Sequence, residues 1–144
     1  MKMKIMKLHD NVVIPNYQTA GAAGFDLCAY IDKPYTMRPG EIKDFGTGIG
    51  VEIPNGYELR LSSRSGLAFK NHISLLNGIG VIDSDFRNEI RVLLKNFGDE
   101  AFTIEPGMRI AQGVVTKYEQ VEFEEVSELS RTGRSGGFGS TGVK

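Results

Sequence analysis

Tyr57-Glu58-Leu59-Arg60-Leu61-Ser62 alternates apolar with polar side chains, which is the period of two expected for a half-buried β-strand. The same alternation recurs at residues 1–5, 25–30, 90–95 and 121–124. Pro-Gly and Asn-Gly turn signals separate these runs. Short strands punctuated in this way predict an all-β sandwich or barrel. The one helical segment that we expect is a single short turn at Gly66–Asn71.

Composition excludes several classes of protein. The 144 residues suit one domain, and 17 Lys and Arg against 18 Asp and Glu give a net charge of −1, which is unlike a strongly basic nucleic-acid binder. One cysteine forms no internal disulfide, and with only two histidines it excludes a usual Cys/His zinc site. No apolar run approaches the roughly 20 residues of a membrane helix, and none follows the basic start MKMKIMKL. We therefore expect a cytoplasmic protein without membrane or nucleic-acid partners.

The last 14 residues, 131–144, differ from the rest of the chain. They hold five glycines and three cations but no acid, whereas residues 119–128 carry five glutamates. This shift predicts a β-barrel domain over residues 1–130 and a flexible Gly-rich arm over residues 131–144. Gly137–Gly142 fits the letters GxGxxG, but no βαβ unit follows it, so a dinucleotide site is rejected.

Five segments mix glycine with a few polar residues in apolar surroundings. They are Ala23-Gly-Phe-Asp-Leu-Cys-Ala29, Ser63-Arg-Ser-Gly-Leu-Ala68, Asn77-Gly-Ile-Gly-Val-Ile-Asp-Ser-Asp-Phe-Arg-Asn-Glu-Ile90, Gly107-Met-Arg-Ile-Ala-Gln112 and Arg134-Ser-Gly-Gly-Phe-Gly-Ser-Thr-Gly142. Arginines and glycine N–H groups bind phosphate oxygens. Carboxylates hold Mg²⁺ or activate water, and aromatic rings stack on bases. Together the segments indicate phosphate chemistry.

In this order and spacing, the five segments resemble the motifs of the trimeric dUTP diphosphatase (dUTPase) family, from about Ala20 to Gly142. The resemblance implies a distorted jelly-roll β-barrel, a homotrimer with active sites at subunit interfaces, and an arm that closes over a neighbour's site. It implies Mg²⁺-dependent hydrolysis of dUTP to dUMP and pyrophosphate, which limits uracil in DNA and supplies dUMP for dTMP synthesis.

By the same resemblance, Asp83 is the general base that activates water against the α-phosphorus. Asp85 is expected to be a turn or salt-bridge acid. The triphosphate is expected to be the main ligand of Mg²⁺, with no direct protein ligand. Asp26 supports Arg64 or a metal-bound water.

Further residues match the family's substrate-binding positions. The resemblance assigns uracil reading to Asn77, Gly80, Val81, Ile82 and Asp83, and phosphate binding to Arg64, Ser65, Gly66 and Gln112. In the arm, Phe138 caps the uracil, while Arg134, Gly139 and Ser140 contact the terminal phosphates.

The chain departs from the family pattern at a few positions. Phe86 stands where Tyr is usual; its ring is expected still to cover the deoxyribose and exclude a 2′-hydroxyl. Ser63 replaces a common Pro, which predicts a looser loop, and Asn88 stands where Gly is common. Arg134 falls one position later than the usual arm arginine, so Arg131 is the second choice for the γ-phosphate.

Two alternatives stay open. A relative of dCTP deaminase has a similar fold, although Arg64-Ser65-Gly66 and the Phe138 arm favour the diphosphatase. The other alternative is a nucleotide-binding regulator that has lost its catalytic activity. The presence of Asp83, Arg64 and the full arm argues against it.

Overall fold

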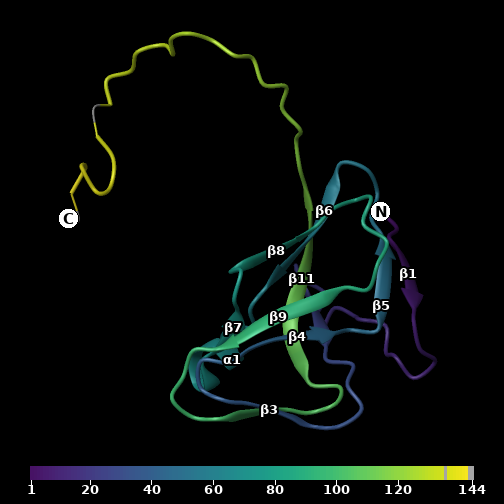
Figure 1. Cartoon of the computed structure of the whole chain (residues 1–144). Helices are drawn as coiled ribbons and strands as arrows, with labels where there is room; N and C mark the ends of the chain where they lie inside the picture. The colour runs from purple at the N-terminus through teal and green to yellow at the C-terminus, as the bar shows by residue number, and fades with distance from the viewer. Residues whose placement is uncertain (135, 143–144) are drawn as a thin grey trace.

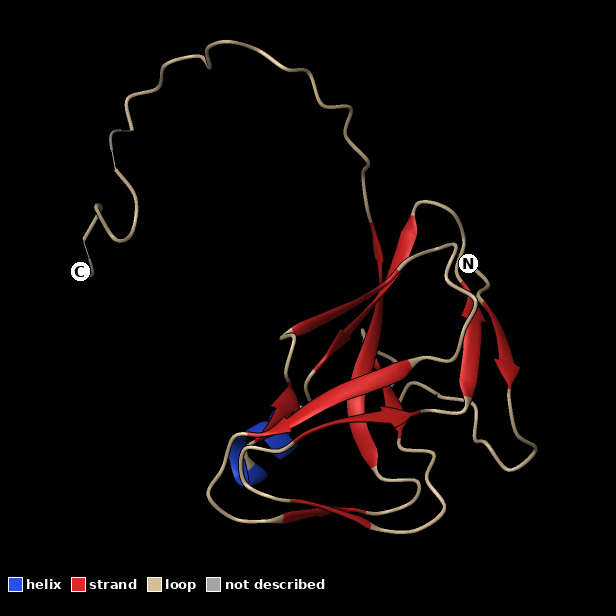
Figure 2. Ribbon diagram, viewed as in Figure 1, coloured by secondary structure: helices blue, strands red, loops and turns tan. Residues whose placement is uncertain are grey.

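The computed structural model describes residues 1–134 and 136–142, and its regular secondary structure is almost entirely short β-strands joined by loops and turns. In chain order the elements are β1 (Lys4–Lys7), β2 (Phe25–Cys28), β3 (Tyr35–Met37), β4 (Ile42–Gly46), β5 (Ile49–Glu52), β6 (Tyr57–Ser62), α1 (Ser65–Asn71), β7 (Ile73–Leu75), β8 (Ile79–Ile82), β9 (Arg91–Asn96), β10 (Phe102–Ile104) and β11 (Arg109–Lys117). Figure 2 shows the strands in red and the short helix α1 in blue at the lower left of the body.

The strands form four antiparallel sheets, which together make a jelly-roll. The largest has the order β2-β11-β6-β8, and the second has the order β4-β9-β7. Two-stranded sheets, β1-β5 and β10-β3, complete the body. Neighbouring strands in a sheet come from distant parts of the chain, so residues from four sequence segments meet on the largest sheet (Figure 1).

Alternating side chains from both larger sheets fill the core. In β6, Leu59 and Leu61 are buried while Arg60 is exposed; in β9, Val92 and Leu94 are fully buried. These strands were predicted by the period of two, and β6 has the predicted bounds. The predicted short helical turn at Gly66–Asn71 is confirmed as α1, which begins one residue earlier.

The prediction of a strand at residues 121–124 is wrong. β11 ends at Lys117, and no strand pairs with the residues after it in the described part of the chain. Val121 and Phe123 are 66% and 92% exposed, because none of the residues that the structure describes covers them. Alternation in the sequence shows that a segment can pair, but a strand also needs a neighbouring edge.

Beyond Tyr118 the chain leaves the body as a long extended segment that curves away from it (Figure 1). Every described residue from Glu119 to the end of this segment is exposed. Of the predicted arm, residues 135, 143 and 144 lie outside the described part. Among the described residues, the structure contains no helix long and apolar enough to cross a membrane.

Candidate active site

Three of the five glycine-containing segments meet at one end of the largest sheet. Gln112 of β11 lies opposite Asp26 of β2 on one side and opposite Ser62 of β6 on the other. Arg64 follows β6 by two residues and reaches the same place, where its Nε lies 3.0 Å from Asp26 Oδ1. We call Asp26, Arg64, Arg109 and Gln112 the Arg64 cluster.

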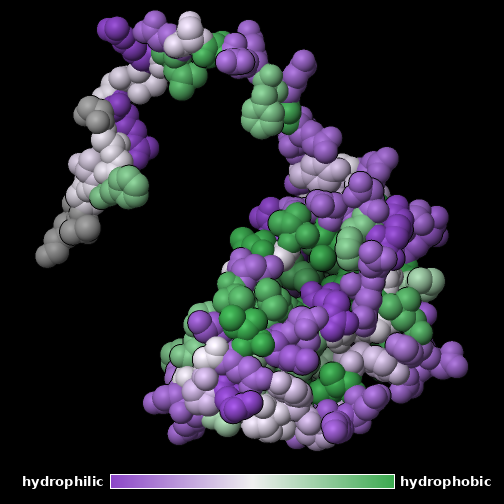
Figure 3. Space-filling model, in the orientation of Figure 1, coloured by the Kyte–Doolittle hydropathy of each residue, from purple (hydrophilic) through white to green (hydrophobic). Residues whose placement is uncertain are grey.

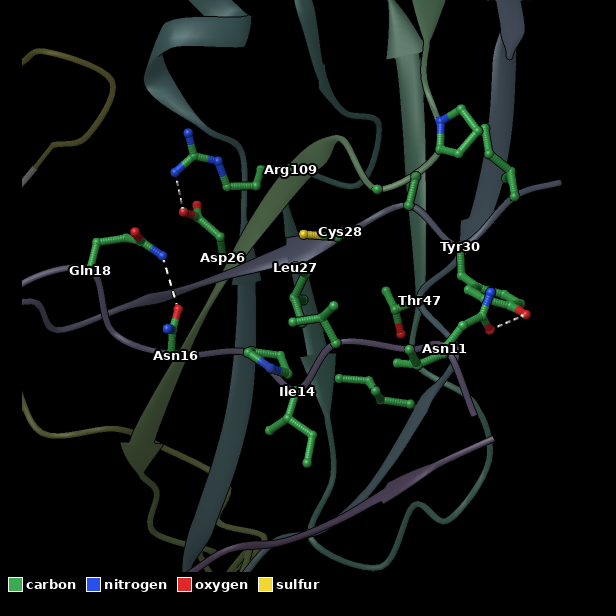
Figure 4. A pocket seen from close by; sticks show the side chains of 18 residues that line it. Asn11, Ile14, Asn16, Gln18, Asp26, Leu27, Cys28, Tyr30, Thr47 and Arg109 are labelled. Atoms are coloured by element: carbon green, nitrogen blue, oxygen red, sulfur yellow. Dashed lines mark hydrogen bonds and ion pairs between the residues drawn. The ribbon is translucent and has the colours of Figure 1, made fainter. Parts of the chain in front are cut away.

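Asp26 holds two arginines at once. Its Oδ1 pairs with Arg64, and its Oδ2 pairs with Arg109 Nη1 at 3.2 Å (Figure 4). Arg64 Nη1 also donates to the Arg109 carbonyl at 3.1 Å, and the carboxylate of Asp26 is only 16% exposed. The guanidinium of Arg64 is thereby fixed in orientation, and its remaining N–H groups are available for an anion. Support of Arg64 by Asp26 was expected from the sequence.

Ser63 was expected to loosen its loop, but the loop is held by hydrogen bonds. Its hydroxyl accepts a hydrogen bond from the Leu75 N–H at 2.8 Å, and its carbonyl accepts one from Gln112 Nε2 at 3.1 Å. The hydroxyl thus adds a contact to β7 that a proline could not make, and the carbonyl adds one to β11. The loop before α1 is anchored on both sides, with Ser65 and Gly66 exposed in the first turn of the helix.

The hairpin from Asn77 to Asp83 forms the edge of the same sheet. Gly78 has a φ of +67°, a left-handed conformation that strains other residues. Gly80 is buried against β6, and a Cβ there would lie 3.1 Å from Leu61 Cβ. Ile79 and Val81 on the opposite face are 51% and 55% exposed. Gly80 therefore serves close packing, as its position in the sequence indicated, whereas Gly78 has open space around it and serves the left-handed turn.

Asp83 follows directly after β8, at the start of a tight turn. The Phe86 N–H donates to the Asp83 carbonyl at 3.1 Å, and Asp83 itself is exposed. Its side chain borders a cleft of about 910 Å³, whose other lining residues include Glu58, Ser84, Asp85 and Tyr118. A carboxylate exposed in a cleft can accept a proton from water.

Within one chain, Asp83 lies apart from the Arg64 cluster. Leu59 of β6 lies opposite Ile82, directly before Asp83, whereas Arg64 is five residues further along the chain. At about 3.3 Å per residue this is roughly 16 Å. The two predicted halves of the site thus lie at opposite ends of β6.

The predicted arm residues lie apart from both halves. Arg134 donates from its Nε to the Gly136 carbonyl within the arm, and Phe138 is fully exposed with a φ of +49°. Gly139 and Ser140 take part in turns within the arm itself. The arm leaves the body without returning to it (Figure 1).

A cavity of about 480 Å³ lies between β2 and the loop over residues 11–18, and Asp26 and Arg109 line it (Figure 4). Cys28 lines it and is half-buried. Burial, together with the charge of Asp26, raises the pKa of the Cys28 thiol, while Arg109 and Arg64 oppose the rise. The thiol is therefore protonated near neutral pH and is not a nucleophile, as expected for a small packed residue.

Sequence reasoning missed two residues near these sites. Arg109 lies in the fourth glycine-containing segment but was not predicted to be a site residue. Its pairing with Asp26 depends on the register of β11 against β2, which shifts at Arg109. Glu58 is buried although it occupies a polar position, because Arg60 and the Thr116 hydroxyl pair with it. The available signal was that Glu58 and Arg60, two positions apart in a predicted strand, carry opposite charges on the same face of the strand.

Comparison with known proteins places this geometry in context. Residues 10–142 match the dUTPase family model. The chain is 54% identical over 143 residues to a deoxyuridine 5′-triphosphate nucleotidohydrolase of Nautilia profundicola, covering 99% of each protein. It is 49% identical to the protein of the same name from Wolinella succinogenes, covering 99% of this chain and 95% of that protein.

A solved structure agrees in fold over the whole chain. The dUTPase of Staphylococcus bacteriophage 80alpha with dUPNHPP superposes with a TM-score of 0.89 at 27% identity, covering 99% of each chain. The family model includes all five glycine-containing segments, from the strand that bears Asp26 to the end of the arm. With half of its residues identical to curated members and the same jelly-roll, the chain belongs to the dUTPase family.

Proposed function

We propose that this protein hydrolyses dUTP to dUMP and pyrophosphate, which limits uracil in DNA and supplies dUMP for dTMP synthesis. The observation that carries the proposal is the convergence of Asp26, Arg64 and Gln112, from three separate segments, on one oriented guanidinium. Such a group suits a phosphate chain. The curated names of relatives that are about half identical support the same substrate.

The hairpin over residues 77–83 reads the base. Its backbone N–H and C=O groups complement the O2, N3–H and O4 edge of uracil, and a cytosine would leave some of them unpaired. An unpaired buried polar group costs about 1–3 kcal/mol, which is enough to discriminate. The close packing of Gly80 on Leu61 supports this role, because backbone that is held tightly leaves no room for a 5-methyl group.

The Arg64 cluster holds the phosphates. Arg64 supplies a planar fork of donors fixed by Asp26, and Gln112 lies beside it with its side chain already tied to the Ser63 carbonyl. The hydroxyl of Ser65 and the exposed backbone of Gly66 complete the binding of the chain.

Asp83 performs the proton transfer. Its carboxylate orients a water molecule and takes a proton from it as the water oxygen attacks the α-phosphorus. The bond from the α-phosphorus to the bridging oxygen breaks, and pyrophosphate leaves with that oxygen. Phe86, at the other end of the turn, covers the deoxyribose.

The residues present fit a magnesium ion carried by the triphosphate. Asp26 is the carboxylate of the Arg64 cluster, and arginines occupy both of its oxygens, so any contact it made with such an ion would be through water. Bound Mg²⁺ would neutralise phosphate charge and favour in-line attack. The protein's part is to orient the chain with Arg64 and the water with Asp83.

We infer that the complete site needs more than one copy of this chain and that the assembly is a homotrimer. The roughly 16 Å along β6 between the Ile82 register position and Arg64 supports the inference, since one substrate must meet both ends. β8 is an edge strand whose outward face presents Ile79 and Val81, both about half exposed. Figure 3 shows apolar side chains gathered over this part of the body. Apolar edges of this kind are normally covered by a partner.

The arm, residues 131–144, would close over a neighbour's site. Its extended course from Tyr118 gives it the reach, and Phe138 is free to cap a base. Arg134 is our choice for the γ-phosphate, followed by Arg131. Gly139 and Ser140 would add contacts to the terminal phosphates.

The test is pyrophosphate release from dUTP, dCTP, dTTP and UTP, with and without Mg²⁺. We expect release from dUTP with Mg²⁺ and little from the other three nucleotides. Ammonia release from dCTP would contradict the proposal in favour of a deaminase. Tight binding of dUTP without pyrophosphate would contradict it in favour of an inactive regulator.

A further inference from the structure

The side chain of Arg87 bridges the turn that carries Asp83. Its Nη1 donates to the Ser84 carbonyl at 2.6 Å and to the Phe86 carbonyl at 3.0 Å. The backbone bond from the Phe86 N–H to the Asp83 carbonyl closes the same turn at 3.1 Å. One guanidinium nitrogen thus ties together two carbonyls on either side of Asp85.

Tyr118 contacts the same turn from the end of β11. Its hydroxyl lies 3.3 Å from Ser84 Oγ, which is a long hydrogen bond. Its own N–H donates to the Gly56 carbonyl at 3.0 Å, so the tyrosine is itself anchored. Tyr118 comes directly after β11, where the extended segment leaves the body.

The position of the turn sets the position of the Asp83 carboxylate. Asp83 is exposed and lies beyond the last β8 residue that pairs with β6, so the sheet itself does not fix it. A general base must lie within hydrogen-bonding distance of its water. A misplacement of about 1 Å can cost about 100-fold in rate.

We propose that Arg87 is a positioning residue, which holds the Asp83–Phe86 turn so that the carboxylate of Asp83 meets the attacking water, and that Tyr118 assists it through Ser84. The inference rests on the proposed role of Asp83 as general base. It assigns a role to two residues outside the proposed base-reading and phosphate-binding sets.

The experiment compares Arg87→Ala, Arg87→Lys and Tyr118→Phe with the wild-type protein. Arg38→Ala is the matched control, because Arg38 is an exposed arginine far along the chain from this turn. Each variant is assayed for kcat and KM with dUTP, and for the Kd of a non-hydrolysable α,β-imido analogue of dUTP.

For Arg87→Ala we expect kcat to fall about tenfold or more, with KM and the analogue's Kd within about twofold. Arg87→Lys should recover part of kcat, since its ammonium can still donate to a carbonyl. Tyr118→Phe should lose only about two- to threefold in kcat because its hydrogen bond is long. Arg38→Ala should match the wild-type protein.

A second readout, amide hydrogen exchange at Phe86, does not depend on activity. It should be faster in Arg87→Ala than in the wild-type protein, because the turn is released. Unchanged exchange, unchanged kcat, or a loss of analogue binding as large as the loss of kcat would overturn the proposal. If the wild-type protein releases no pyrophosphate from dUTP, the proposed function fails, and the exchange measurement still decides whether Arg87 holds the turn.

Discussion

At the scale of single residues, the pair of Asp26 and Arg64 does more than neutralise two charges. Most exposed ion pairs contribute little to stability. Here the carboxylate is mostly buried and also binds Arg109, so it fixes how the Arg64 guanidinium points. We therefore expect the pair to matter mainly by orienting Arg64 for the substrate.

Asp26→Asn should lower kcat/KM for dUTP about 10- to 100-fold while the protein stays folded, because the neutral amide holds Arg64 weakly. Steady-state kinetics and a thermal melt measure both effects. Asp44→Asn is the matched control, since Asp44 pairs with Arg91 in another sheet, away from the site. A kcat/KM in Asp26→Asn equal to that of the control would contradict the orienting role.

Phe86 should preserve the preference for deoxyribose although it lacks a phenol hydroxyl. The ring itself crowds a 2′-hydroxyl, so Phe86→Tyr should leave the ratio of kcat/KM for dUTP and UTP within about threefold. Phe86→Ala should bring the two substrates closer together. Parallel kinetics on both nucleotides check this, and equal turnover of UTP and dUTP by the wild-type protein would show that the ring does not discriminate.

At the scale of elements, the period of two predicted the positions of strands well, but it did not show which segments find a neighbouring strand to pair with. β6 was predicted with its observed bounds, because its alternation reflects one buried and one outer face. Glu58 broke the pattern through a buried pairing with Arg60 and Thr116 that only the folded sheet creates. Residues 121–124 alternate equally well, yet no described strand pairs with them, since pairing depends on an edge that the sequence does not reveal.

Deletion of residues 132–144 tests the arm as an element. The described arm residues are exposed and pack on no part of the body, so the truncated protein should keep its fold and melting temperature. We expect its dUTP turnover to fall at least about 100-fold, because nothing would then cap the substrate or reach its terminal phosphates. Turnover near the wild-type rate would show that the arm is no part of the site.

At the scale of the whole molecule, the family resemblance predicted the residues of the candidate site and an active site at a subunit interface, but residue patterns alone did not show how one chain divides them. The sequence placed Asp83 and Arg64 in one site through a family resemblance. Only the register of β6 against β8 shows that one chain holds them at opposite ends. Such a separation depends on strand pairing between distant segments, which residue patterns along the chain do not encode.

Shared sites predict complementation between two inactive variants. Asp83→Asn and Arg64→Gln should each be nearly inactive as homo-oligomers. When the two are co-assembled in equal amounts, about a quarter of the sites should combine an intact Asp83 from one subunit with an intact Arg64 from another. Pyrophosphate release should therefore reappear at about that fraction of the wild-type rate. No recovery in co-assembled oligomers would place the whole site within one chain.

The most direct test of the account is single-turnover hydrolysis of dUTP by Asp83→Asn beside the wild-type protein. The amide has nearly the same shape but accepts no proton, so the rate of the chemical step should fall about 100- to 10,000-fold while dUTP still binds. A variant that cleaves dUTP as fast as the wild-type protein would contradict the assignment of Asp83 as the base.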